Sequence, residues 1–154
     1  AYVGHSFGGA VGVYLSATDK DLIGKLVLIS ASYRRPVTRA FKQLDISAVK
    51  RLLTPVRRLA YKIFYPGSVA LKFAHLESNF RRIVSTDLSD LLGQIGSETL
   101  VLWPADDIET PLNDAYVLRD SMKNSHLEII GSTGHDLPIN YVELIEDKVR
   151  RFLG

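Results

Sequence analysis

The sequence has the composition of an ordinary globular protein. It contains 154 residues, of which 46% are hydrophobic and 23% are charged, and its formal net charge is +2. This length predicts about one domain. No apolar stretch approaches the roughly 20 residues that a membrane-spanning helix needs, which argues against such a helix. Because the chain has no cysteine, disulfide bonds and thiol chemistry are excluded.

Charge is distributed unevenly along the chain. Residues 34–82 hold twelve Lys and Arg side chains against two acidic ones, a net charge of about +10, while the rest of the chain carries about −8. A split of this size indicates two regions with different roles.

The first thirty residues predict a strand, a helix and a strand. Residues 2–3 form the end of a short strand, and residues 7–17, rich in glycine and alanine, form a helix that can pack closely on a sheet. Residues 25–30 are continuously apolar, which is typical of a parallel strand buried on both faces.

Residues 34–96 show no strand pattern, and their apolar residues recur at helical spacing. Strands are predicted again at 99–103 and 126–130, with a helix from 110 to 122 between them. A last helix is expected to begin at Asn140, with Glu143 as its capping-box partner. Its expected buried stripe is Val142, Ile145, Val149 and Phe152.

This alternation predicts an α/β fold with a parallel sheet of about four strands, interrupted by an all-helical insertion. The expected organisation is a first core segment at 1–33, the basic insertion at 34–96, and a second core segment at 97–154.

The motif Gly-His-Ser-Phe-Gly lies between the first strand and the first helix. A serine between glycines on a strand-to-helix turn is typical of a nucleophile elbow, which exposes the hydroxyl. Such a hydroxyl needs a base to take its proton, an acid that orients the base, and donors for the oxyanion. Ser6 is therefore the candidate nucleophile.

The candidate base is His135, in the loop that follows the last predicted strand. His5 lies inside the elbow and cannot fold back on its neighbour, His75 lies in the insertion, and His126 begins a strand. The candidate acids lie in the loop after the preceding strand and are Asp106, Asp107 and Glu109. Of the adjacent pair, we expect one carboxylate to point toward His135 and the other toward solvent.

The order Ser, Asp, His along successive strands resembles the α/β-hydrolase superfamily, in its cap-domain, lipase- and esterase-like form. In that family the acid loop commonly begins with Trp and ends with Pro, and Trp103 and Pro111 then place the acid at Asp107. Gly134-His135 matches the base loop, and the terminal Phe152-Leu153 matches the last helix. Pro104 stands where the family usually has Gly, which leaves Asp106 as the alternative acid.

The resemblance has further implications for the site. It makes the Phe7 N–H one oxyanion donor, places His5 and residues of the insertion near the substrate, and gives residues 34–96 the position of a helical cap. Aromatic residues of this cap are expected mainly to pack its helices, and some to line an acyl pocket. Because the family carries further strands before the nucleophile strand, we expect this chain to be the C-terminal part of a longer protein, with a partial hydrolase fold.

The function that follows is a serine hydrolase for an ester or related carbonyl substrate, working through an acyl-enzyme without metal or cofactor. Acyl transfer, hydrolysis of a carbon–carbon bond, and ligand binding without catalysis remain open alternatives. The expected partner is a small-molecule substrate. The basic insertion is interpreted as a solvated basic face, with docking on an anionic lipid surface and recruitment of an anionic substrate as the alternatives. Nucleic acid is not expected, because no recognition motif is present. The expected location is cytoplasmic.

Overall fold

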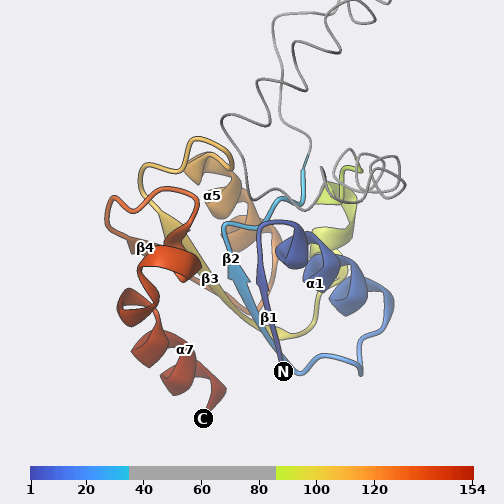
Figure 1. Cartoon of the computed structure of the whole chain (residues 1–154). Helices are drawn as coiled ribbons and strands as arrows, with labels where there is room; N and C mark the ends of the chain where they lie inside the picture. The colour runs from blue at the N-terminus through green and yellow to red at the C-terminus, as the bar shows by residue number, and fades with distance from the viewer. Residues whose placement is uncertain (35–85) are drawn as a thin grey trace, which may run out of the picture. The chain divides into compact units, whose positions relative to one another are not determined.

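A computed structural model describes residues 1–34 and 86–154, which belong to one compact unit, Ala1–Arg35 with Val84–Gly154. Four strands of this unit lie side by side in chain order, and each pairs in parallel with the next (Figure 1). They are β1 (Tyr2–His5), β2 (Lys25–Ile29), β3 (Glu98–Pro104) and β4 (Ser125–Ile130). The predicted parallel α/β sheet is therefore confirmed.

Helices connect and cover these strands. The α-helices are α1 (Phe7–Thr18), α5 (Leu112–Ser121), α6 (Leu137–Asn140) and α7 (Glu146–Leu153), and two 3₁₀ turns are η2 (Ser89–Gln94) and η3 (Val142–Leu144). Most of the insertion predicted at 34–96, including its basic helices and aromatic residues, lies outside the described residues. Its boundaries therefore stay a prediction.

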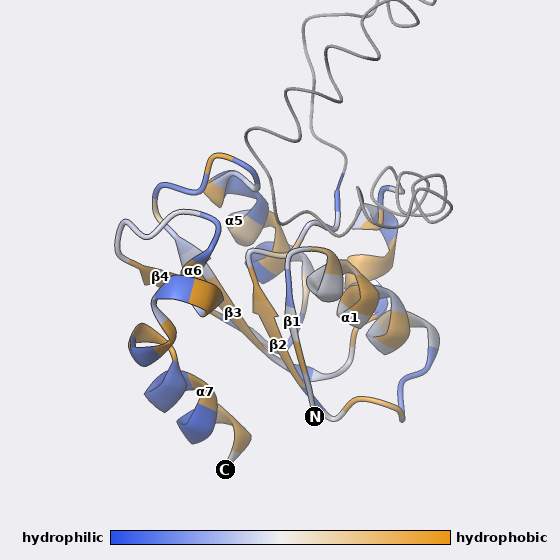
Figure 2. Cartoon of the chain, in the orientation of Figure 1, coloured by the Kyte–Doolittle hydropathy of each residue, from blue (hydrophilic) through white to orange (hydrophobic). Residues whose placement is uncertain are grey.

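Alternate residues of the central strands enter two separate cores. On one face of β2, Leu26 and Leu28 pack with α1, η2 and α5, while Val27 and Ile29 pack on the other face with residues of α6 and α7. Because both faces of β2 are covered, every position from Leu26 to Ile29 is apolar. In Figure 2, β2 and β3 are coloured largely orange, the colour of hydrophobic residues.

The described end of the predicted insertion packs on the sheet. Leu92 and Ile95 are almost fully buried in the same core as α1 and α5. The amide of Leu88 donates to the carbonyl of Tyr33 at 2.9 Å. This bond joins the two segments that flank the undescribed stretch.

The sequence prediction was wrong about the last helix. Asn140 is the final residue of α6, and α7 begins six residues later, at Glu146. Pro138 occupies the first turn of α6 and favours a helix start at that earlier point. The chain then leaves the helical path at Tyr141, where φ is −139°. Val142, expected in the buried stripe, is consequently 53% exposed.

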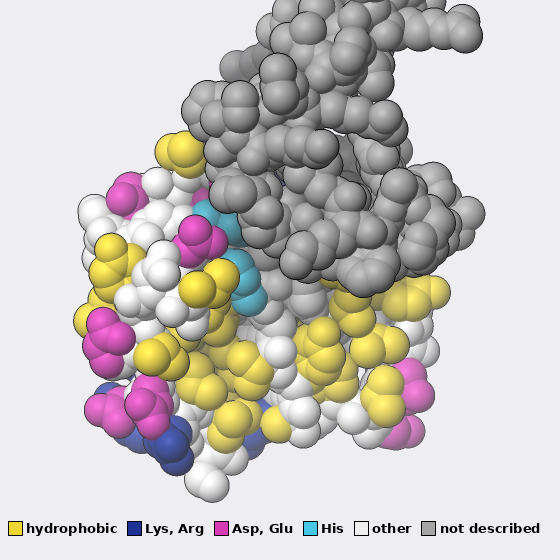
Figure 3. Space-filling view, in the orientation of Figure 1, with side chains coloured by type: hydrophobic (Ala, Val, Ile, Leu, Met, Phe, Trp, Pro, Cys, Tyr) yellow, Lys and Arg dark blue, Asp and Glu magenta, His cyan; other side chains and the backbone are white. Residues whose placement is uncertain are grey.

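The outer surface of the described unit is mixed. Acidic and basic side chains gather at the lower left of Figure 3, where α7 lies, and Glu146 and Arg150 form an i,i+4 ion pair there. Among residues 1–34 and 86–154, no helix is both long and apolar enough to cross a membrane.

Gly9 is a point of close contact between α1 and the chain after β2. A Cβ atom at this position would lie 2.5 Å from the Cβ of Ala31 and 2.8 Å from its Cα. Both are much shorter than a van der Waals contact, and the second atom belongs to the backbone. The glycine therefore lets the helix lie against this segment.

We predict that Gly9→Ala lowers the free energy of unfolding by about 1 to 3 kcal/mol, the usual cost of overpacking. In an unobstructed helix the same change raises stability by about 1 kcal/mol, so the sign of the effect identifies the steric cause. Urea unfolding measures it, with Gly24→Ala as the control because a Cβ there meets nothing within 4 Å. A Gly9→Ala chain as stable as the parent would contradict this packing.

Candidate active site

Three loops that carry polar side chains meet at the carboxyl edge of the sheet. Ser6 follows β1, the segment 105–111 follows β3, and the segment 131–136 follows β4. Parallel strands place all of these loops at the same edge, where open α/β sheets bind their ligands. The sheet thus assembles residues that are 100 or more positions apart in sequence.

Ser6 has the backbone conformation of a sharp turn. Its φ is 50° and its ψ is −115°, a region that residues with a side chain rarely adopt. Two hydrogen bonds stabilise this backbone conformation. The Ser6 amide donates to the carbonyl of Ile29 at 3.0 Å, and the Ser32 amide donates to the Ser6 carbonyl at 2.9 Å. A Cβ on Gly4 would lie 2.5 Å from the carbonyl oxygen of Gly8, so the turn is too tight for a side chain there.

A chain of hydrogen bonds connects Ser6, His135 and Asp107. The Ser6 Oγ lies 2.9 Å from Nε2 of His135, and Nδ1 of the same ring lies 2.9 Å from Oδ2 of Asp107. The Asp107 side chain is fully buried, and that of His135 is 11% exposed. With Nδ1–H donated to the carboxylate, Nε2 is left to accept the serine proton. The three residues selected from the sequence are therefore brought together.

Asp107 is stabilised as a carboxylate by donors from its own loop. Its Oδ1 accepts the amides of Glu109 at 2.9 Å and Thr110 at 2.8 Å, and its Oδ2 accepts the Thr110 hydroxyl at 2.7 Å. Burial by itself raises the pKa of Asp107, but the hydrogen bonds from Thr110 and His135 outweigh it and hold the pKa below its usual value. The group that faces the imidazole is therefore negatively charged.

The adjacent acid, Asp106, makes a different contact. Its Oδ1 accepts the amide of Gly134 at 2.9 Å, and this glycine has a φ of 65°, in the left-handed region. Asp106 is exposed. One carboxylate of the pair thus points to the imidazole and the other is exposed, as the sequence argument expected. The bond from Asp106 to the base loop was not expected.

His5 links the elbow to the base loop. Its Nε2–H donates to the backbone carbonyl of His135 at 2.8 Å, and the two rings lie 4.9 Å apart. Burial lowers the pKa of His5, and the bond to the carbonyl offsets this only in part. His5 is consequently neutral at pH 7, and its contact with substrate, expected from the resemblance, stays a prediction.

Thr110 was missed by the sequence argument. It was assigned only to the start of a helix, yet it gives Asp107 two hydrogen bonds, and its carbonyl accepts Nε1–H of the buried Trp103 at 2.8 Å. Its hydroxyl also lies 3.3 Å from Nδ1 of His135. The sequence did contain a signal for this role, because a hydroxyl side chain three positions after an aspartate can hydrogen-bond to its carboxylate.

Phe7, the expected oxyanion donor, is the first residue of α1, so its amide lies at the helix N-terminus.

Within the described part of the chain, no group of three or more His, Asp or Glu side chains is arranged to hold a metal ion.

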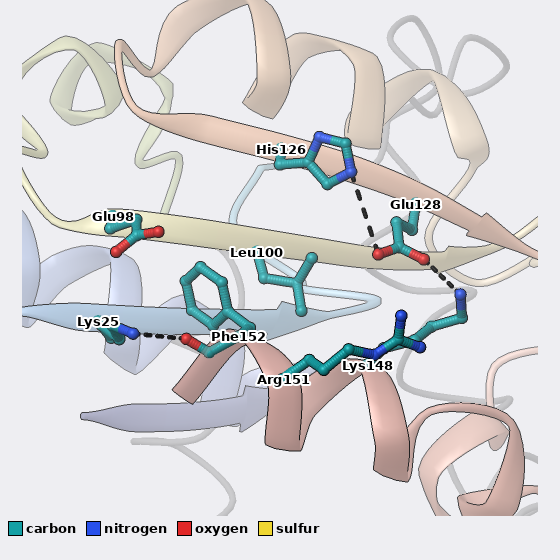
Figure 4. A pocket seen from close by; sticks show the side chains of 8 residues that line it. All are labelled: Lys25, Glu98, Leu100, His126, Glu128, Lys148, Arg151 and Phe152. Atoms are coloured by element: carbon teal, nitrogen blue, oxygen red, sulfur yellow. Dashed lines mark hydrogen bonds and ion pairs between the residues drawn. The ribbon is translucent and has the colours of Figure 1, made fainter. Parts of the chain in front are cut away.

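A groove of about 360 Å³ lies at the opposite edge of the sheet, between the strands and α7 (Figure 4). Lys25, at the start of β2, donates to the carbonyl of Phe152 at 2.6 Å, and Lys148 pairs with Glu128 at 2.5 Å. His126 lies 4.0 Å from the same Glu128. These charged groups contact one another or the end of α7, which indicates a role in holding the helix on the sheet.

We predict that Thr110→Val reduces the part of the folding stability that depends on ionised Asp107. A carboxylate with a lowered folded-state pKa adds stability above its unfolded pKa of about 4 and loses it as the pH falls through the folded-state pKa. The variant should therefore be about 1 to 2 kcal/mol less stable at pH 7, and the difference should shrink as the pH falls below 4.

Urea unfolding between pH 3 and pH 8 measures the effect. Thr110→Ser, which keeps the hydroxyl, is the matched control and should follow the parent chain. A Thr110→Val deficit that is the same at all pH values would mean that the hydroxyl does not act through the Asp107 carboxylate.

Comparison with known proteins gives sequence relatives and structural neighbours. No family model matches the chain. It is 27% identical over 99% of its length to "Putative carbamate hydrolase RutD" of Rhizobium rhizogenes. It is 24% identical over 98% of its length to 2-hydroxy-6-oxononadienedioate/2-hydroxy-6-oxononatrienedioate hydrolase 1 of Pseudomonas putida. These matches cover 66% and 61% of the relatives, so the chain spans less than two thirds of their length.

Two solved structures with a similar fold are hydrolases. A serine hydrolase involved in carbazole degradation, CarC, matches 98% of the chain with a TM-score of 0.69 and 24% identity, and 62% of CarC is covered. MGS-M2, an α/β hydrolase from a deep-sea metagenome, matches 99% with a TM-score of 0.70 and 18% identity, and 64% of that chain is covered. Together with the sheet order and the loop positions, these likenesses show that the chain has part of an α/β-hydrolase fold.

Proposed function

We propose that the protein to which this chain belongs is a serine hydrolase that cleaves an ester or related carbonyl substrate through an acyl-enzyme. The observation that carries the proposal is the continuous hydrogen-bond chain from Ser6 Oγ through His135 to the buried Asp107. The names of the relatives support hydrolysis as the reaction class.

In this mechanism the Ser6 hydroxyl attacks the substrate carbonyl and passes its proton to Nε2 of His135. Asp107 accepts Nδ1–H throughout and stabilises the imidazolium while it exists. The Phe7 amide, at the start of α1, contributes to binding the oxyanion, as the resemblance implies. His135 then protonates the leaving group, and a water molecule activated by the same nitrogen releases the acyl group. None of these steps requires a metal or a cofactor.

Two related reactions would use the same residues. Hydrolysis of a carbon–carbon bond is the second candidate, because 2-hydroxy-6-oxononadienedioate hydrolase is the name of a relative that matches nearly the whole chain. Acyl transfer to an acceptor other than water differs only in the second half of the cycle. Ligand binding without turnover on this fold is the non-enzymatic alternative, and a nucleophile probe distinguishes it from the others.

The proposed partners are a small-molecule substrate and an anionic lipid surface. The lipid proposal depends on residues 34–82, with twelve basic and two acidic side chains, because clustered Lys and Arg side chains are attracted to anionic headgroups. The cytoplasmic location expected from the sequence remains a prediction.

We predict that a fluorophosphonate labels Ser6 and that Ser6→Ala abolishes both the labelling and ester hydrolysis, with kcat lowered about 10⁴-fold or more. Intact-mass analysis and p-nitrophenyl butyrate turnover measure the two effects. Ser121→Ala, at an exposed serine of α5, is the control and should behave as the parent. Absence of labelling at Ser6 in the complete protein that contains this chain would contradict the hydrolase. Labelling without turnover of any ester would favour the binding protein.

We also predict that the chain sediments with vesicles that contain phosphatidylserine more than with vesicles of phosphatidylcholine alone. Salt should weaken this binding, because exposed charges are screened. Equal binding to both kinds of vesicle would exclude an electrostatic contact with lipid.

A further inference from the structure

A second carboxylate approaches the imidazole at the nitrogen that faces Ser6. Oε2 of Glu109 lies 3.9 Å from Nε2 of His135, whereas the carboxylate of Asp107 contacts the opposite nitrogen, Nδ1. The Glu109 side chain is 57% exposed, in contrast to the fully buried Asp107. The sequence presented Glu109 only as a candidate for the triad acid, and this position gives it no part in that role.

The position of Glu109 is fixed by the same loop that holds the triad acid. Its amide donates to Oδ1 of Asp107 at 2.9 Å, so its backbone is anchored while its side chain extends toward Nε2 of His135. Among the described residues, His135 is the one basic group within 4 Å of the Glu109 carboxylate. The negative charge of Glu109 is therefore not neutralised by a described Lys or Arg.

The negative charge of Glu109 lies beside the nitrogen of His135 that would protonate the leaving group. If His135 acts as the general acid, the leaving atom must come within about 3 Å of Nε2 to receive the proton. Since Glu109 Oε2 is 3.9 Å from the same nitrogen, the leaving atom lies within about 7 Å of the carboxylate. A charged substituent a few bonds from that atom lies within roughly 10 Å of the carboxylate, a distance over which a partly exposed charge still acts at low ionic strength.

We propose that Glu109 is a specificity-determining residue that selects leaving groups by charge, favouring a cationic or neutral leaving group over an anionic one. The inference rests on the proposed serine hydrolase and narrows its substrate class. It places esters, carbamates and amides with an amino or ammonium group on the leaving side among the good substrates. Substrates with a carboxylate on that side are correspondingly poor ones.

The test uses the complete protein that contains this chain and compares three butyrate esters of phenols that carry a 3-trimethylammonio group, no substituent, or a 3-carboxylate. The measured quantity is kcat/KM for the cationic ester divided by kcat/KM for the anionic ester, after subtraction of turnover by Ser6→Ala. Intrinsic differences in leaving-group reactivity, and charges elsewhere in the chain, cancel when this ratio is compared between variants. Glu109→Gln, which keeps the shape and removes the charge, should lower the ratio about ten-fold.

Two variants separate the effect of charge from other causes. Glu109→Asp keeps the carboxylate and should retain most of the selectivity. Glu98→Gln removes the same charge at the amino end of β3, about 20 Å along the strand from the acid loop, and should leave the ratio unchanged. Raising the ionic strength from about 20 mM to 500 mM should bring the ratio of the parent chain toward that of Glu109→Gln.

The outcomes distinguish the two proposals. If Ser6-dependent turnover is present and Glu109→Gln leaves the ratio within two-fold of the parent, the charge selection is wrong and the hydrolase stands. If neither the esters nor a fluorophosphonate react at Ser6, the proposed hydrolase is wrong and the selection by Glu109 is wrong with it. A thermal melt of each variant verifies that the compared chains are folded.

Discussion

The hydrogen bond between Asp107 and His135 is the contact on which the rest of the site depends. It joins the loop after β3 to the loop after β4, and the second nitrogen of the same ring reaches the elbow after β1. A single imidazole therefore connects three loops of the sheet edge. Its geometry is productive only if the strands keep their parallel order, because that order brings the three loops to the same place.

The loops are held in this arrangement by backbone contacts that do not involve the triad side chains. His5 reaches the carbonyl of His135 from the elbow, and Asp106 holds the amide of Gly134 from the acid loop. Trp103 fixes the same acid loop by its bond to the carbonyl of Thr110. A buried carboxylate is costly unless it is hydrogen-bonded, and this scaffold supplies Asp107 with the donors it needs.

Charge is arranged differently at the two edges of the sheet. In the groove toward the amino edge, Lys148 pairs with Glu128 and Lys25 donates to the Phe152 carbonyl at the end of α7. At the carboxyl edge, Asp107 is buried against the imidazole, while Glu109 remains half-exposed beside Nε2. Among the described residues, Glu109 thus places an exposed carboxylate beside the imidazole nitrogen that faces Ser6.

Much of the fold was predictable because its signals are local. The apolar run at 25–30 and the small residues after Ser6 each identify an element without knowledge of its neighbours, and the glycines of the elbow mark the turn. The end of the chain was not predictable in this way. Asn140 and Glu143 match a capping box, but the preceding Pro138 starts a separate helix, and tertiary packing buries Ile145 while it leaves Val142 exposed.

The sequence by itself determined the residue types of the site and the order of the loops that carry them, because strands and turns are indicated by local patterns of neighbouring residues. It singled out Ser6, His135 and the acidic pair, but the choice of Asp107 over Asp106 came from a family resemblance. Only the tertiary structure decided which carboxylate meets the imidazole, that Thr110 supports it, and that Glu109 faces Nε2. Such choices depend on distances across the sheet edge, which no local pattern encodes.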